Sequence, residues 1–433
     1  MDYNEIYRRK VVDIDTAIKR VLDGDGKTIV LGMAAMEPQA FLKRIHEHEF
    51  RNLRVFSCLD MIDFEVMENP KFSGHFLNES WFYSGPTRRT ASSGIGTVTY
   101  IPNNLHAAGS DKLLNDKPNI YWGIASPMDK HGYLTLSLSV VYEKDMVENV
   151  KNVVLEVNPN APRTLGDTQI HISDVDYIIE VDYPIPTIQN PQPTEEDKRI
   201  AEYIAELIKD GSTIQLGIGG IPNAVSFFLT DKHDLGIHTE MLTQGMIDLL
   251  NKGVITNRKK TLWPGKMVCT FGLGERSMYD FVDDNPGVIF LRGRYVNDPN
   301  IIAKNNKMVS INTALMVDLT GQVCSESIGK KHYSGTGGQL DTHRGATMAK
   351  DGKGIIALHS TTKNGTISKI VTFLPEGSGV TVPRQDVDWI VTEYGTVHIR
   401  GKSVKERAKM LISIAAPEFR EELTKKARMY NLI

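Results

Sequence analysis

The sequence has few cysteines, no long apolar run and no excess of positive charge. Its three cysteines, Cys58, Cys269 and Cys324, are an odd number without the spacing of metal ligands, which favours buried, reduced thiols over a disulfide framework. No apolar run approaches the roughly 18 residues that a membrane span needs, and the start lacks a signal-peptide pattern. A formal net charge of −3 argues against a nucleic-acid surface. Together these absences predict a cytoplasmic protein that binds neither membranes nor nucleic acid.

What is present fits a globular enzyme of two domains. Apolar residues make up 41% and charged residues 24% of the 433 positions, which is ordinary for such proteins, and the length exceeds what one core supports. Four prolines between Tyr183 and Pro193 indicate a semi-rigid linker. We therefore predict an N-terminal α/β domain over residues 1–185 and a C-terminal α/β domain over residues 186–433.

The two halves repeat one another weakly, in four segments that keep the same order. Each segment alone is a weak match, but their shared order predicts two similar α/β domains. The matched segments are residues 23–41 with 210–228, residues 53–59 with 235–241, the Asp-x-x-Gly turns at 129–132 and 318–321, and residues 173–180 with 385–393.

The stretch from Asp210 to Gly245 carries the main candidate site. A short apolar run stopped by Gly217, Gly219 and Gly220 predicts a strand, a tight turn and a helix start, and such turns aim backbone N–H groups at anions or carbonyl oxygens. A second apolar run, residues 235–239, predicts a buried strand with Glu240 at its carboxyl end, the edge at which ligands bind in open α/β sheets. We expect the turn and Glu240 to be neighbours.

The repeat indicates one catalytic carboxylate per chain, because it aligns Cys58 of the first half with Glu240 of the second. The first domain is then expected to form one wall of a cleft. With an unperturbed pKa near 4.3, Glu240 is expected to be ionised at neutral pH.

Other stretches have two interpretations. The glycine cluster that ends at Gly338 can offer amides to an oxyanion or be a structural turn. His238 can be a metal ligand or a packed side chain, of which we favour the second. A triad of Ser334, Asp341 and His343 is not favoured, because a single glycine loop orients its members poorly. The pair Arg88-Arg89 is either a contact for a carboxylate or phosphate or part of a solvated loop.

With these residues in view, the chain resembles the acetyl-CoA hydrolase/transferase family of CoA-transferases, and within it the 4-hydroxybutyrate and butyryl-CoA:acetate CoA-transferases. The likeness spans nearly the whole chain. It is strongest in the segments DGSTIQLGIGGIP, LGIHTEM, YVNDPNI, SINTALMVDLTGQV, SGTGGQLD and VTEYG.

The resemblance implies a ping-pong exchange of coenzyme A between a short acyl-CoA and a carboxylic acid such as acetate, butyrate or 4-hydroxybutyrate. Glu240 would be the nucleophile and carry a glutamyl-CoA thioester, while Gly338 and Asn297 would contact the oxyanion. Coenzyme A is then a cosubstrate, with no metal or redox cofactor, and the alternative is acyl-CoA hydrolysis. The residues implied to bind coenzyme A are Gly217, Ile218, Gly219, Gly220, Ile221 and Gly338.

The family also implies open α/β domains related to ribose-5-phosphate isomerase-like folds, an active site in the cleft between them, and a homo-oligomer, dimeric or larger. One departure stands out. Where many relatives have an aromatic residue after the Asp of the Gly-Gly-Gln-x-Asp motif, this sequence has Thr342 followed by His343. This departure bears on the choice of acyl chain.

Overall fold

The structure, a computed structural model, describes residues 2–189, 191–217, 219–362 and 364–433. The chain packs into two compact units. Unit 1 comprises residues 1–188 and 268–296, and unit 2 comprises residues 189–267 and 297–433. Residues 268–296 therefore pack with the N-terminal part of the chain, although they follow the proline linker in sequence.

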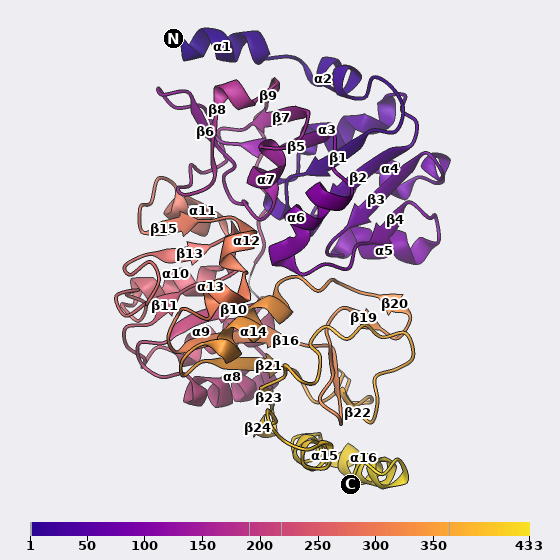
Figure 1. The fold of residues 1–433 in the computed structure, drawn as a ribbon, viewed down its shortest axis with the longest axis vertical. Coiled ribbons are helices and arrows are strands. Elements are labelled where there is room, and N and C mark those ends of the chain that lie inside the picture. Colours follow the sequence, from indigo (N-terminus) through magenta and orange to yellow (C-terminus); the bar gives the residue numbers. More distant parts are fainter. Residues whose placement is uncertain (1, 190, 218, 363) are drawn as a thin grey trace. The chain divides into compact units, whose positions relative to one another are not determined.

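A seven-stranded sheet forms the centre of unit 1, in the order β4-β3-β2-β1-β5-β7-β9 (Figure 1). All neighbouring strands run parallel. Every residue of β5 is buried, as expected for a parallel strand covered on both faces. The strands are β1 (Thr28–Leu31), β2 (Leu53–Ser57), β3 (Phe76–Ser80), β4 (Val98–Tyr100), β5 (Ile120–Ala125), β7 (Asn152–Val157) and β9 (Tyr177–Glu180).

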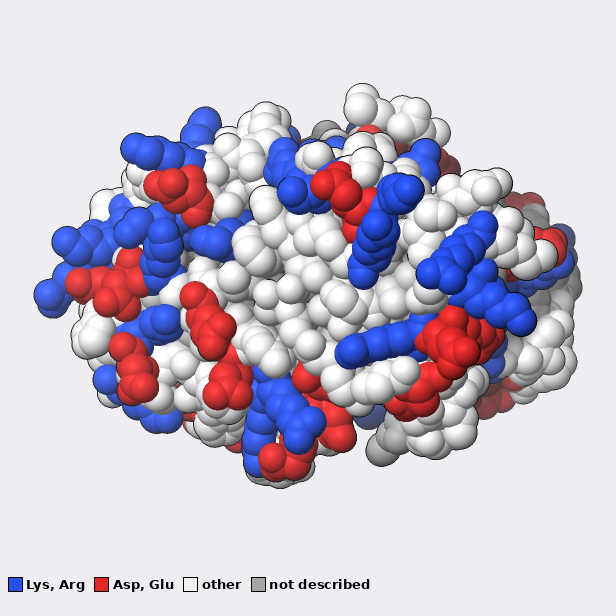
Figure 2. Space-filling view, turned by 90° about the horizontal axis from the view of Figure 1, so that it is seen from below, with Lys and Arg blue, Asp and Glu red and all other residues white. Residues whose placement is uncertain are grey.

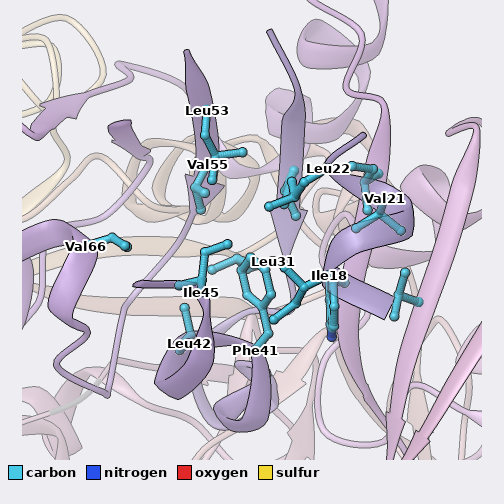
Figure 3. Packing of buried hydrophobic residues seen from close by; sticks show 14 of the residues in the cluster. Ile18, Val21, Leu22, Leu31, Phe41, Leu42, Ile45, Leu53, Val55 and Val66 are labelled. Atoms are coloured by element: carbon cyan, nitrogen blue, oxygen red, sulfur yellow. The ribbon is translucent and has the colours of Figure 1, made fainter. Parts of the chain in front are cut away.

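Helices α2 and α3 cover part of this sheet with apolar side chains. Ile18 and Val21 come from α2, Phe41 and Leu42 come from α3, and all four belong to one buried cluster with Leu31 of β1 (Figure 3). Burying each such side chain contributes about 1.5 to 3 kcal/mol. The helices of unit 1 are α1 (Tyr3–Lys10), α2 (Ile14–Val21), α3 (Gln39–Arg44), α4 (Glu65–Glu68), α5 (Gly85–Ser93), α6 (Leu105–Asn115), α7 (Glu143–Val147), α11 (Arg276–Val282) and α12 (Gly293–Val296). Its smaller strands are β6 (Tyr133–Thr135), β8 (Gln169–His171), β13 (Met267–Cys269), β14 (Phe271–Gly272) and β15 (Val288–Phe290).

A six-stranded sheet forms the centre of unit 2, in the order β11-β10-β16-β21-β23-β24. The first five strands are parallel, and β24 runs antiparallel to β23. The strands are β10 (Thr213–Leu216), β11 (Gly236–Ile237), β16 (Met308–Thr313), β21 (Lys353–Ala357), β23 (Trp389–Thr392) and β24 (Gly395–His398).

Two helices of unit 2 begin with a capping box. Thr194 and Asp197 form a capping box at the start of α8, and Ser403 and Glu406 form one at the start of α15, so backbone N–H groups at both helix starts are paired. The helices are α8 (Glu195–Leu207), α9 (Gly220–Phe228), α10 (Gln244–Asn251), α13 (Pro299–Ile302), α14 (Gln339–Met348), α15 (Val404–Ser413) and α16 (Pro417–Met429). Smaller strands are β12 (Met241–Leu242), β17 (Met316–Asp318), β18 (Val323–Cys324), β19 (Ser327–Ile328), β20 (Lys331–His332) and β22 (Ile370–Val371).

The predicted repeat is confirmed by the two sheets. The order β2-β1-β5-β7-β9 of unit 1 corresponds to β11-β10-β16-β21-β23 of unit 2. The Asp-x-x-Gly turns also agree, since Oδ1 of Asp129 and Oδ1 of Asp318 each accept hydrogen bonds from the N–H groups two and four residues later. The prediction of two similar α/β domains is therefore correct.

The surface carries charges of both signs. Figure 2 shows Lys and Arg side chains interspersed with Asp and Glu on the face that it presents, in keeping with a net charge of −3. None of the helices within the described ranges has the length and hydropathy of a membrane-spanning segment. All three cysteines are buried free thiols, as predicted.

Candidate active site

Glu240 follows the edge strand of the unit 2 sheet. This strand, β11, is shorter than the predicted one, because only Gly236 and Ile237 pair with β10 in the ladder. The N–H of His238 still donates to the carbonyl of Ile214 in β10, at 3.3 Å. Because β10 and β11 are parallel, Glu240 and the glycine turn after β10 both lie beyond the carboxyl ends of these strands, as predicted.

The open side of β11 is closed by side chains instead of another strand. The Lys260 ammonium donates to the carbonyl of Ile237 at 2.6 Å, and the Ile237 N–H donates to Oδ1 of Asn257 at 2.9 Å. Lys260 is only 5% exposed. These two residues hold the segment that leads to Glu240, and sequence reasoning missed them because nothing in their local pattern connects them to β11.

Two donors surround the Glu240 carboxylate. The Asn297 amide donates to Oε2 at 2.7 Å, and the Gly338 backbone hydrogen-bonds to the same carboxylate. The approach of Gly338 is very close, since a Cβ placed on it would lie 1.8 Å from Oε2 of Glu240 and 2.0 Å from Nδ2 of Asn297. Only glycine fits at this position, and Glu240, Asn297 and Gly338, all named from the sequence, meet in one place.

Helices α13 and α14 bring the two donors together. Asn297 directly precedes α13, which begins with Asp298 as N-cap and Pro299 as first residue, a favourable combination for a helix start. Gly338 is the N-cap of α14. The helices pack closely, because a Cβ on Gly345 of α14 would lie 2.6 Å from side-chain carbons of Ile302 in α13.

The pKa of Glu240 corrects the expectation of a fully ionised carboxylate at neutral pH. Burial raises this pKa to about 7, the Asn297 hydrogen bond lowers it, the nearby charge of Asp341 raises it, and the Gly338 backbone hydrogen bond lowers it. Removing water from a carboxylate disfavours its charged form. At neutral pH, a substantial fraction of Glu240 is therefore protonated.

A pH dependence of activity follows. We expect kcat/KM for an acyl-CoA to rise with pH through about 7, because only the ionised carboxylate is nucleophilic. Asp341→Asn removes the charge that raises the pKa of Glu240, so it should move the rise to lower pH. Profiles from about pH 5 to about pH 9 bracket this transition. The matched control is Asp351→Asn, at an exposed turn, and equal midpoints for Asp341→Asn and the unchanged enzyme would contradict the assignment.

The glycine turn after β10 has the backbone that the sequence predicts. Gly219 has φ +116° and ψ −175°, a conformation available essentially to glycine alone. Gly220 begins α9, and a Cβ on it would lie 2.5 Å from Oδ2 of Asp197. Gly217 and Ile221 flank the turn, and Ile221 is buried. The remaining predicted member, Ile218, lies outside the described residues.

Asp197 and His359 behind this turn were not predicted as site residues. Oδ1 of Asp197 lies 2.9 Å from Nε2 of His359, and Oδ2 accepts from the Thr194 N–H at 2.9 Å. Asp197 lies in the first turn of α8, and its contact with His359, two residues after β21, depends on the folded sheet.

The disfavoured triad does not form. Nε2 of His343 accepts from the Asp388 N–H at 3.2 Å, and burial lowers the His343 pKa to about 4. The Ser334 hydroxyl donates to the Ser325 carbonyl at 2.7 Å. These two side chains are therefore engaged elsewhere. Asp341 instead lies near Glu240, where its charge acts on the carboxylate.

The structure also bears on the expectations for His238 and for the pair Arg88-Arg89. His238 is 1% exposed, which agrees with the packed side chain that we favoured. The pair Arg88-Arg89 lies in helix α5 and not in a loop. Arg89 forms an ion pair with Asp63.

Comparison with known proteins decides the family. The models of the acetyl-CoA hydrolase/transferase N-terminal and C-terminal domains match residues 1–189 and 274–427. The chain is 42% identical to 4-hydroxybutyrate coenzyme A transferase of Clostridium kluyveri, over 98% of both chains. The chain belongs to the acetyl-CoA hydrolase/transferase family.

Further relatives differ in how much of the chain they match. Succinyl-CoA:cyclohexane-1-carboxylate CoA transferase of Geobacter metallireducens is 42% identical, with 100% of this chain and 98% of the relative covered. The crystal structure of RipA from Yersinia pestis superposes with a TM-score of 0.93 at 37% identity, over 100% of both chains. An acetyl-CoA hydrolase of Kluyveromyces lactis matches over only 49% of this chain, at 29% identity.

Proposed function

We propose that this chain transfers coenzyme A between a short-chain acyl-CoA and a carboxylic acid, with Glu240 as the covalent carrier. The observation that carries the proposal is the Glu240 carboxylate at the carboxyl end of a sheet strand, with Oε2 held by the Asn297 amide at 2.7 Å and the carboxylate also hydrogen-bonded by the Gly338 backbone. The full-length relatives named as CoA transferases support the same reaction class. Acetate, butyrate and 4-hydroxybutyrate are the acids we infer.

We infer different roles for the two carboxylate oxygens, because the Asn297 amide donates to Oε2. Oε1 of Glu240 attacks the thioester carbonyl and forms the new C–O bond, the C–S bond breaks, CoA leaves as a thiolate, and an acyl-glutamyl anhydride remains. The thiolate then attacks Cδ, negative charge collects on Oε2, and Asn297 and Gly338 stabilise it there. Collapse expels the first acid with Oε1 and leaves glutamyl-CoA. A second carboxylate reverses these steps.

The raised pKa of Glu240 suits this role. A carboxylate with a pKa of about 7 is more basic than an ordinary glutamate, and general Brønsted behaviour makes a more basic nucleophile more reactive. The donors to the Glu240 carboxylate offer stabilisation that grows as charge develops, worth roughly 3 to 4 kcal/mol per donor in other acyl-transfer enzymes. Gly217, Gly219, Gly220 and neighbouring Ile221 are proposed to bind coenzyme A at the same edge.

The test is mass spectrometry of the protein after incubation with acyl-CoA alone. Covalent CoA on Glu240, removed by a carboxylic acid and trapped by borohydride, is the expected result. Thiol release with and without acetate separates transfer from hydrolysis: release that requires no acid would favour the hydrolase alternative. Assembly into a dimer or larger oligomer stays a prediction.

A further inference from the structure

A group of polar side chains lies between helix α14 and the unit 2 sheet. We name it the buried polar network, and it consists of Gln215 from β10, Ser310 and Asn312 from β16, and Thr342 from α14. Gln215 and Thr342 are each 3% exposed and Ser310 is 0% exposed, whereas Asn312 is only partly buried. Burying a polar group costs free energy unless the group is hydrogen-bonded. A polar network between a helix and a sheet, in place of apolar packing, therefore needs an explanation.

The four side chains pair with one another. The Ser310 hydroxyl donates to Oε1 of Gln215 at 2.8 Å and lies 3.0 Å from the Thr342 hydroxyl oxygen. The Asn312 amide donates to the Ser310 and Thr342 hydroxyl oxygens at 2.9 and 3.1 Å. Gln215 and Ser310 are direct neighbours in the register of β10 and β16. Networks of this kind fix their members in one arrangement.

The network is connected to both parts of the active site. The Thr342 N–H donates to the Gly338 carbonyl at 2.9 Å, so the residue that anchors α14 to the sheet also holds the peptide at Gly338. Gln339 adds a second tie, because its side-chain amide donates to the Thr313 carbonyl at 3.1 Å. At the other end, Gln215 is two residues before Gly217, the first glycine of the turn.

We propose that Thr342, through the buried polar network, positions Gly338 against the Glu240 carboxylate during CoA transfer. The inference rests on the proposed function of Glu240. Thr342 touches no reacting atom and is a positioning residue. Its hydroxyl fixes the first turn of α14 on β16, and this turn fixes the Gly338 backbone donor.

The threonine at position 342, where many relatives have an aromatic residue, has an explanation other than the choice of acyl chain. The Thr342 hydroxyl faces Ser310 and Asn312 of the sheet. An aromatic ring in its place has no hydroxyl at this position to complete the network. We therefore attribute the threonine to the attachment of α14.

Thr342→Val tests the proposal because it keeps the shape of the side chain and removes only the hydroxyl. We expect kcat to fall about 10-fold with KM for acyl-CoA nearly unchanged, since partial loss of an oxyanion donor acts on the transition state. The pH midpoint of kcat/KM should rise, because the Gly338 hydrogen bond lowers the Glu240 pKa. The single-turnover rate of glutamyl-CoA formation should fall in parallel with kcat.

Two controls are built into the same helix. Thr342→Ser retains the hydroxyl and should restore kcat and the pH midpoint. Thr347→Val removes a hydroxyl that donates to the Arg344 carbonyl of the same helix, at 2.9 Å, and should leave both unchanged. If Thr342→Val does not fold, Ser310→Ala is measured by the same criteria.

A purely structural role has a different signature. Thr342→Val would then melt at a lower temperature while its kcat and pH midpoint stay as in the unchanged enzyme, and this result would overturn the inference. Failure of the proposed function is recognised separately, by CoA transfer that persists in Glu240→Gln.

Discussion

Glu240→Gln is expected to abolish CoA transfer, with kcat lower by roughly 10⁴-fold or more, since removal of the nucleophile costs about 10⁶-fold in a well-studied protease. The amide is nearly isosteric, and its oxygen can still accept from Asn297, which donates to the carboxylate at 2.7 Å. The amide cannot form the anhydride that the CoA thiolate would attack. Folding should be preserved, because burial already favours an uncharged group at this position.

The measurement combines steady-state transfer with the mass of the intact protein. Glu240→Gln should show neither turnover nor a CoA adduct, whereas the unchanged chain should show both. Glu376→Gln is the matched control, because the Glu376 side chain is 87% exposed and lies outside the site. Transfer at a normal rate by Glu240→Gln would refute the assignment of the nucleophile.

Gly338→Ala is expected to lower kcat by about 10²- to 10³-fold, the usual cost of losing an oxyanion donor. The added Cβ would lie 1.8 Å from Oε2 of Glu240 and 2.0 Å from Nδ2 of Asn297, so one of these groups must move. Backbone strain is not the cause, since Gly338 has φ −101° and ψ 16°, which alanine adopts readily. The free energy of unfolding should therefore change much less than the activity.

Gly85→Ala provides the control for a glycine substitution at a helix start. The Cβ at Gly85 would meet only the end of the Arg89 side chain, at 3.4 Å, which can move aside. Steady-state kinetics and thermal unfolding of both variants check the prediction. Equal activity of Gly338→Ala and Gly85→Ala would show that the close approach of Gly338 to Glu240 has no catalytic consequence.

The repeat made much of the fold predictable. Asp129 and Asp318 were matched on four-residue patterns alone, and both residues form the same side-chain turn in the structure. The pattern is local, since a carboxylate accepts hydrogen bonds from N–H groups a few residues later, and local chemistry is readable from sequence. Residues 268–296 are the counter-example, because their packing with unit 1 depends on contacts far along the chain.

The charge state of Glu240 shows where sequence reasoning failed. An unperturbed pKa predicted an ionised group, whereas burial and the charge of Asp341 raise the pKa of Glu240 to about 7. Burial depends on every segment that packs around the carboxylate, and no local pattern reports it. For the same reason Lys260 and Asn257, which complete the edge strand, were not found.

The sequence alone indicated the duplicated α/β architecture, the turn glycines and Glu240 as the candidate acid, because each depends on residue type and short-range spacing. The tertiary structure decided how Asn297 and Gly338 converge on Glu240, how far its pKa rises, and how Thr342 joins helix α14 to the sheet. These features arise where segments distant in the chain pack together, and packing of this kind is a property of the whole fold.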